Sequence, residues 1–159
     1  MNTSKSLAAA VVAALISACA TPQTPSPITD TARRTPQLST LATLIDDAGL
    51  AQTLRDSGPY TVFAPSDDAF KAVPPATLQA LASDKELLKS VLTFHVLPGK
   101  VSGVDVKNGN AKTVQGANVA LSKSGSFITV EDAVVTQADV PASNGVVHVI
   151  DRVLMPPKK

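Results

Sequence analysis

Residues 60–70 constrain the fold of this 159-residue chain more than any other stretch. Residues 60–63, Tyr-Thr-Val-Phe, are all β-branched or aromatic, which favours a buried strand. Pro65 cannot donate to a sheet ladder, so it should end that strand. Ser66 is a preferred helix N-cap, and the two aspartates after it would lie in the first turn, where the helix dipole favours carboxylates. The stretch therefore predicts a strand, a sharp corner and the start of a helix.

The residues around the corner also match a known pattern. Residues 61–70, Thr-Val-Phe-Ala-Pro-Ser-Asp-Asp-Ala-Phe, resemble the first signature box of the fasciclin domain. Residues 92–99, Leu-Thr-Phe-His-Val-Leu-Pro-Gly, are similar to the family's central Tyr-His motif, with Phe94 in place of the tyrosine. Residues 144–154 are similar to its second signature box. Three boxes in this order, at single-domain spacing, make the resemblance cover residues 36–156.

The resemblance implies a fold and two sets of site residues. The implied fold is α+β and fasciclin-like, with an N-terminal helical half packed on a wedge-shaped, mostly antiparallel sheet. The implied structural signature comprises Thr61, Phe63, Pro65, Ser66, Asp67, Phe70, Gly145, His148 and Asp151. The family's interaction segment corresponds here to Phe94, His95, Val96, Leu97 and Pro98. The alternative for this segment is that it simply belongs to the core.

The residue pattern gives the same order of elements independently. Apolar residues at helical spacing run from Leu38 to Ala48, and Ser83 followed by Glu86 reads as a capping box that opens a further helix. From residue 100 the character changes to β, with a hairpin turn at residues 123–126. The last strand, residues 146–154, is apolar on both faces, which is typical of a central strand.

The first 18 residues read as an export signal. Lys5 precedes an apolar, alanine-rich run that is too short to span a bilayer as a mature helix. Ile-Ser-Ala-Cys at residues 16–19 resembles a bacterial lipobox, in which Cys19 would receive lipid. The alternative is an ordinary secretory signal cleaved near Ala18 or Ala20. Since alanine rather than aspartate follows the cysteine, we expect sorting to the outer membrane in a two-membrane bacterium.

The remaining boundaries follow from composition. Residues 19–36 hold several prolines among Thr, Ser and Gln, so we expect a tether that carries the anchor cysteine. The fasciclin domain should occupy residues 37–156, and residues 157–159 form a tail. Cys19 is the sole cysteine, so an internal disulfide is excluded and the domain must rely on its core.

The search for catalytic chemistry yields little. Neither histidine, His95 nor His148, has a ligand set at metal-binding spacing, and we expect no metal and no cofactor. A grouping of Ser66, His148 and Asp67 has no supporting motif, so we expect no enzyme. Both histidines are predicted to be buried, neutral and hydrogen-bonded. A formal charge of +1 gives no electrostatic case for nucleic acid.

Two function classes remain. The resemblance implies a cell-surface adhesion or interaction module that binds a protein or glycan partner, held to the envelope membrane through its lipid anchor alone. The alternative is a periplasmic or envelope protein that binds a small hydrophobic ligand or lipid in a cleft between helices and sheet.

Overall fold

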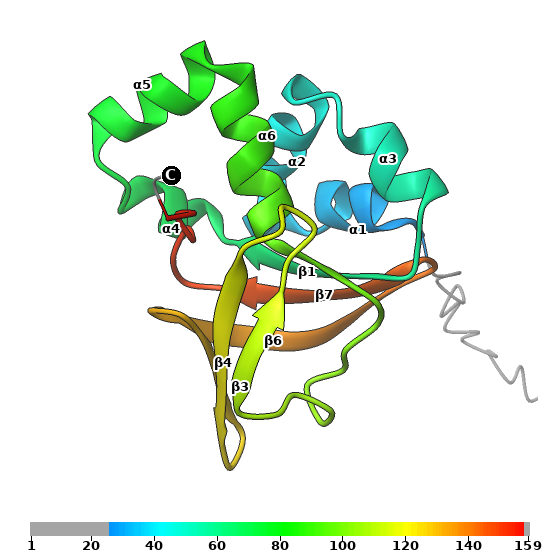
Figure 1. Ribbon diagram of the computed structural model, residues 1–159. Coiled ribbons are helices and arrows are strands. Elements are labelled where there is room, and N and C mark those ends of the chain that lie inside the picture. Colours follow the sequence, from blue (N-terminus) through cyan, green and yellow to red (C-terminus); the bar gives the residue numbers. More distant parts are fainter. Residues whose placement is uncertain (1–25, 158–159) are drawn as a thin grey trace, which may run out of the picture.

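The computed structural model describes residues 26–157, and its first half is helical (Figure 1). One strand, β1, interrupts the helices and carries the chain through the middle of the molecule. The helical elements are α1 (Ile28–Arg34), the 3-10 turn η1 (Pro36–Leu38), α2 (Ser39–Asp47), α3 (Ala51–Asp56), α4 (Asp67–Lys71), α5 (Pro75–Ser83) and α6 (Lys85–Phe94).

The second half supplies most of a seven-stranded sheet. Its strands are β1 (Tyr60–Pro65), β2 (Val96–Pro98), β3 (Gly109–Lys112), β4 (Asn118–Ser124), β5 (Phe127–Val130), β6 (Ala133–Ala142) and β7 (Gly145–Ile150). The strand order is β2-β1-β7-β6-β5-β4-β3. Among these strands β1 and β7 pair in parallel and the other neighbours pair antiparallel. The predicted α+β class with a mostly antiparallel sheet is confirmed.

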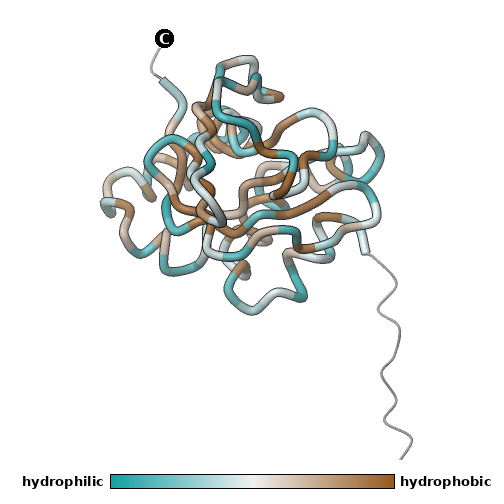
Figure 2. Tube along the Cα trace, turned by 90° about the horizontal axis from the view of Figure 1, so that it is seen from below, coloured by the Kyte–Doolittle hydropathy of each residue, from teal (hydrophilic) through white to brown (hydrophobic). Residues whose placement is uncertain are grey.

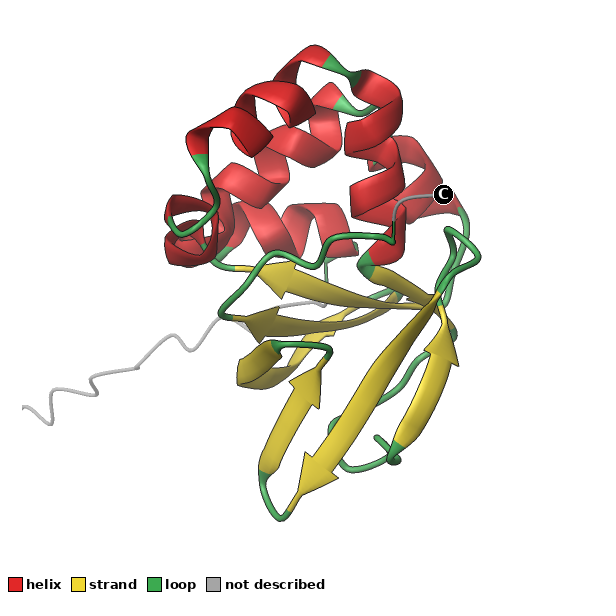
Figure 3. Cartoon of the chain, turned by 60° about the vertical axis from the view of Figure 1, so that its left-hand side comes forward, coloured by secondary structure: helices red, strands yellow, loops and turns green. Residues whose placement is uncertain are grey.

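Helices and strands lie on opposite sides of the molecule (Figure 3). One apolar cluster joins the helices to β1 and β7, and a second fills the space between the strands, around Phe63, Val119 and Ile150. The apolar stretches of the trace run through the middle of the molecule, while many peripheral loops are hydrophilic (Figure 2). Every residue of β7 is buried, as predicted for a central strand.

The corner after β1 forms as predicted. Pro65 is the last residue of the strand, and Ser66 caps α4 by accepting a hydrogen bond from the Ala69 N–H at 3.2 Å. Phe63 and Phe70, on either side of the corner, are both buried. The predicted hairpin is also confirmed, because β4 and β5 pair from Leu121–Val130 to Ser124–Phe127.

The tether prediction is wrong in its second half. Residues 28–34 form helix α1, and Ile28 and Ala32, one turn apart, are each 1% exposed within the helical core. Arg33 reaches back to Asp46 of α2 at 2.7 Å. Only two of the four buried residues of this short helix are apolar, so a composition rich in Thr and Pro gave no sign of it.

Three local predictions also need correction. Asp84, not Ser83, caps α6, and its carboxylate accepts hydrogen bonds from the N–H groups of Glu86 and Leu87. The last strand ends at Ile150, four residues earlier than predicted, and its ladders to both neighbours, β1 and β6, end at that residue. The change to β structure that was predicted from residue 100 comes later, since β3, the first strand after that point, begins at Gly109.

The predicted signal peptide, Cys19 and the first part of the tether lie outside the described residues, as do the last two residues of the tail. In residues 26–157, every helix is too short or too polar to cross a bilayer.

Candidate functional site

Thr61 ties β1 to the chain that follows β2. It is fully buried, and its hydroxyl donates to the Gly99 carbonyl at 2.8 Å while accepting from the Val101 N–H at 2.7 Å. A hydroxyl can do both at once, whereas valine, its isostere, can do neither. The first signature threonine therefore fixes the course of the segment after β2.

Asp67 caps a helix other than its own. Its two carboxylate oxygens accept from the Thr40 N–H at 2.9 Å and from the Ser39 hydroxyl at 2.7 Å. Both donors belong to the first turn of α2, whose own N-cap position, Leu38, offers no side-chain acceptor. Burial raises the pKa of Asp67, but the hydrogen bonds from Thr40 and Ser39 outweigh that effect and leave the pKa lowered.

His95 bridges the end of α6 and the C-terminal strap, a name used here for residues 151–157. Its Nδ1 lies 2.7 Å from the Val91 carbonyl and therefore donates, so Nε2 is free to accept from the Leu154 N–H at 2.9 Å. The ring is 2% exposed. Desolvation lowers the pKa of His95 to about 4, against a smaller opposing effect of the hydrogen bond to Val91.

His148 plays the corresponding part in the sheet. Its Nε2 donates to the Val101 carbonyl at 2.8 Å, and its Nδ1 accepts from the Asp139 N–H at 3.1 Å. The ring is 1% exposed and stacks on Phe63 at a centroid distance of 5.7 Å. The two histidines thus hold opposite tautomers, and the predicted burial and hydrogen bonding of both are confirmed.

Gly145 and Asp151 anchor the two ends of β7. A Cβ added at Gly145 would lie 1.8 Å from the Tyr60 carbonyl oxygen, so no other residue fits between β1 and β7 there. The Asp151 carboxylate accepts from the Val134 N–H at 2.7 Å, and its own N–H donates to the Val134 carbonyl.

Asn144, which sequence reasoning did not single out as a site residue, joins three elements. Its side-chain oxygen accepts from the Ile28 N–H at the start of α1, at 2.9 Å. Its side-chain nitrogen donates to the Leu54 carbonyl in α3, and its backbone carbonyl accepts from the Tyr60 N–H. Its position directly before Gly145 in the second box was the available signal.

The predicted interaction segment is mostly interior. Phe94, His95, Val96 and Leu97 are each at most 4% exposed, and only Pro98 is open to solvent. The alternative considered for this segment, that it belongs to the core, is the correct one. Val96 belongs to the helical cluster, whereas Phe94 and Leu97 belong to the strand cluster, so the segment packs into both halves of the molecule.

The side chains of Ser66, His148 and Asp67, considered above as a catalytic grouping, make their hydrogen bonds to other groups and not to one another. Both nitrogens of His148 are engaged by backbone groups, Ser66 caps α4, and Asp67 caps α2. Among residues 26–157 no three His, Cys, Asp or Glu side chains gather at metal-binding distance.

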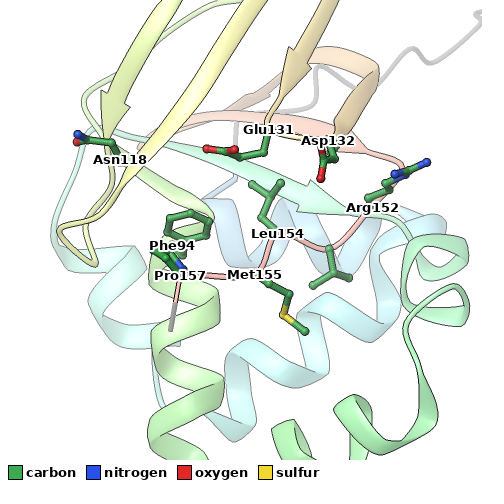
Figure 4. A pocket seen from close by; sticks show the side chains of 10 residues that line it. Phe94, Asn118, Glu131, Asp132, Arg152, Leu154, Met155 and Pro157 are labelled. Atoms are coloured by element: carbon green, nitrogen blue, oxygen red, sulfur yellow. The ribbon is translucent and has the colours of Figure 1, made fainter. Parts of the chain in front are cut away.

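Two hollows lie against the C-terminal strap. One has a volume of about 490 Å³ and lies between the strap and the turn that joins β5 to β6 (Figure 4). A second, of about 410 Å³, lies between the strap, α5 and α6. It is lined by Ala76, Thr77, Ala80, Leu81, Leu87, Val91, Met155 and Pro156, all of them uncharged.

Comparison with known proteins gives a consistent result. The sequence pattern of the fasciclin domain matches residues 36–156. Protein sll1483 of Synechocystis sp. is 41% identical over 121 residues, which cover 75% of this chain and 67% of that protein. Immunogenic protein MPB70 and cell surface glycolipoprotein MPB83, both of Mycobacterium bovis, are each 38% identical over 136 residues. This chain spans 69% of the former and 61% of the latter.

A solved structure shares the fold. It is a FAS1 domain pair from the insect cell adhesion molecule Fasciclin I, with a TM-score of 0.63 and 24% sequence identity. The match covers 77% of this chain and 46% of that chain, as expected for one domain set against a pair.

Proposed function

Since this chain belongs to the fasciclin domain family, we propose that it is an exported, envelope-anchored adhesion or interaction module that binds a protein or glycan partner. The observation that carries the proposal is the 38% identity, over 82% of this chain, to a cell surface glycolipoprotein. That relative's name combines surface location with lipid attachment, the same two properties that Cys19 and its lipobox suggest here.

The anchor has a direct test. Replacing Cys19 by serine removes the thiol that would be acylated, and the Cys19→Ser protein should then leave the membrane pellet and appear in the supernatant. Because the lipid on Cys19 is the one membrane attachment proposed for this chain, the shift should be nearly complete. Retention of Cys19→Ser in the pellet at the wild-type level would contradict lipid anchoring.

Adhesion is tested separately from anchoring. A surface coated with the purified chain should retain more cells of the source organism than the same surface coated with heat-denatured chain. Free chain added in excess should compete the attachment away, because it occupies the same partner. Equal attachment to native and denatured coatings would contradict the proposal.

A second candidate function rests on the apolar hollow of about 410 Å³ between α5, α6 and the strap. Its size and uncharged lining suit a small hydrophobic ligand or an acyl chain. Lipid extracted from the purified chain should then be detectable by mass spectrometry at a fixed ratio to protein. Ala80→Leu should fill the hollow and reduce that ratio, whereas Ala82→Leu, on the same helix but outside the lining, should not.

A further inference from the structure

The hollow between the strap and the turn from β5 to β6, here called the carboxylate pocket, combines an apolar floor with an acidic wall. Phe94 and Leu154 lie at its base and are almost fully buried, while Met155, 46% exposed, forms one side. Glu131 and Asp132 form the wall contributed by the turn between β5 and β6, opposite the strap (Figure 4). At about 490 Å³ it falls within the size range of ligand sites.

Glu131 is held in place before any ligand arrives. Its backbone has a φ of 53°, a left-handed conformation that is uncommon for glutamate. Its N–H donates to the Ala120 carbonyl at 2.8 Å, and one side-chain oxygen accepts from the Ala120 N–H at 2.7 Å. The other oxygen of the same carboxylate is left for a ligand, in an orientation that costs little further entropy to maintain.

The charges of the pocket are not neutralised internally. Within residues 26–157 neither Glu131 nor Asp132 takes part in an ion pair. Arg152 lines the pocket at the end far from Asn118 (Figure 4), leaving a net charge of −1 among the lining residues. A cationic group placed above the apolar floor would therefore meet an excess of negative charge.

The apolar lining of the pocket favours a polypeptide ligand over a sugar. Aromatic faces are the usual platforms for apolar ring surfaces, yet Phe94, the aromatic residue of this lining, is 2% exposed and presents almost no face. The accessible apolar surface comes from Met155 and Pro157, which suit an aliphatic stem. Lysine carries such a stem behind its charge.

From this geometry we propose that the carboxylate pocket receives a lysine side chain, flanked by apolar residues, from a partner polypeptide. The ammonium lies between Glu131 and Asp132, and the methylene stem lies on Met155 and Pro157. The inference rests on the proposed interaction function and specifies its partner as a protein with an exposed lysine in an apolar setting.

The first test uses small probes of matched size. Amide and methyl NMR spectra of the full chain carrying Cys19→Ser are recorded during titration with hexylammonium, hexanol, hexanoate and N-acetylglucosamine. Hexylammonium should shift the Leu154, Met155 and Asp132 signals more strongly than hexanol, hexanoate should shift them least, and added salt should weaken the ammonium response. Equal or stronger responses to hexanoate or N-acetylglucosamine would overturn the proposal.

The second test removes charge without removing hydrogen-bond acceptors. The double variant Glu131→Gln/Asp132→Asn keeps the acceptor for Ala120, so it should fold normally while binding hexylammonium roughly threefold or more weakly. Hexanol binding should be unchanged. The matched control, Glu86→Gln/Asp105→Asn, removes two charges from exposed positions outside the pocket and should bind like the parent. Equal weakening in both double variants would overturn the proposal.

The same variants distinguish failure of the pocket proposal from failure of the proposed adhesion function. In the cell-attachment assay the pocket double variant should compete poorly, and the control double variant should compete fully. Full competition by both, with attachment intact, would overturn the pocket as the site and leave adhesion standing. If a surface coated with the parent chain retained no more cells than the denatured coating, the adhesion function would be contradicted, whatever the NMR titrations show.

Discussion

At the scale of single residues, His95 holds the C-terminal strap in place through its hydrogen bond with Leu154. Its Nε2 must remain unprotonated to accept from Leu154, because a protonated ring would present an N–H to another N–H. Leu154 lies in the strap that walls every large hollow described above. The protonation state of one buried ring therefore bears on the whole surface around the strap.

This arrangement predicts acid sensitivity. The pKa of His95 is lowered from 6.5 to about 4, so the unfolded chain takes up its proton at a higher pH than the folded chain does. The associated stability is complete above about 6.5 and is lost as the pH falls toward about 4, a difference of roughly 3 kcal/mol. Urea unfolding at a series of pH values measures it.

The His95→Leu variant supplies the comparison for this pH series. At neutral pH it should be less stable by about 1–3 kcal/mol, since the Leu154 N–H loses its acceptor inside the core. Between pH 6.5 and 4 its stability should decline less steeply than that of the wild type. Parallel curves for the two proteins would assign the acid sensitivity to other groups.

Asp67 offers a prediction about capping. Asp67→Ala should lower the free energy of unfolding by about 1–2 kcal/mol, because the first turn of α2 loses its acceptor. Asp68→Ala removes the neighbouring carboxylate, whose side chain is 88% exposed and pairs with Lys71 at the surface, and should change stability by less than about 0.5 kcal/mol. Thermal melts of the two variants test this prediction, and an equal loss of stability in both would contradict the capping role of Asp67.

Sequence reasoning found these residues but not all of their partners. Ser66 was predictable because an N-cap acts within three residues of itself. The contact between Asp67 and α2 spans 28 residues to Ser39, and the three bonds of Asn144 span up to 116 residues. Such contacts depend on how the helices dock, which local sequence rules do not specify.

Among the elements, the pair of β1 and β7 depends on one glycine. Gly145→Ala would place a methyl group against the Tyr60 carbonyl and should destabilise the domain by about 3 kcal/mol. Gly116→Ala is the control, since it has a left-handed backbone but open space around the added Cβ, and should cost less. Comparable melting temperatures for the two variants would contradict this prediction, since they would show that β1 and β7 can move apart at Gly145.

Helix α1 tests where the folded domain begins. Ile28→Ala should cost about 2–5 kcal/mol if this helix is part of the core, because Ile28 is 1% exposed. Arg34→Ala, on the exposed side of the same helix, should melt close to the wild type. Unchanged melting in Ile28→Ala would restore the view of residues 26–36 as a tether.

The elements differed in how well the sequence predicted them. β1, β4, β5 and β7 carry β-branched or alternating residues and were anticipated. β6 was not anticipated as one long strand, since two register shifts interrupt it and most of its later residues are exposed. A strand that is bulged and half solvated lacks the period on which such predictions rely.

For the whole molecule, three motifs in order predicted the architecture, but the pockets of its surface could not be predicted from the sequence. The carboxylate pocket joins residues 94, 118, 131–133, 152–155 and 157, which no single motif contains. Its carboxylates come from a turn and its floor from a helix end and the strap. Pockets of this kind appear once the fold has brought the segments together.

The parallel pairing of β1 and β7 also has a mechanical consequence. The chain enters β1 from the helices and leaves β7 through the strap, so tension between the two ends pulls these neighbours in opposite directions along their length. Six residue pairs, from Tyr60–Gly145 to Pro65–Ile150, are then loaded together in shear, whereas α1 can peel away one contact after another. Single-molecule stretching should record a weak early extension followed by one abrupt, far stronger rupture when the pairing of β1 with β7 breaks.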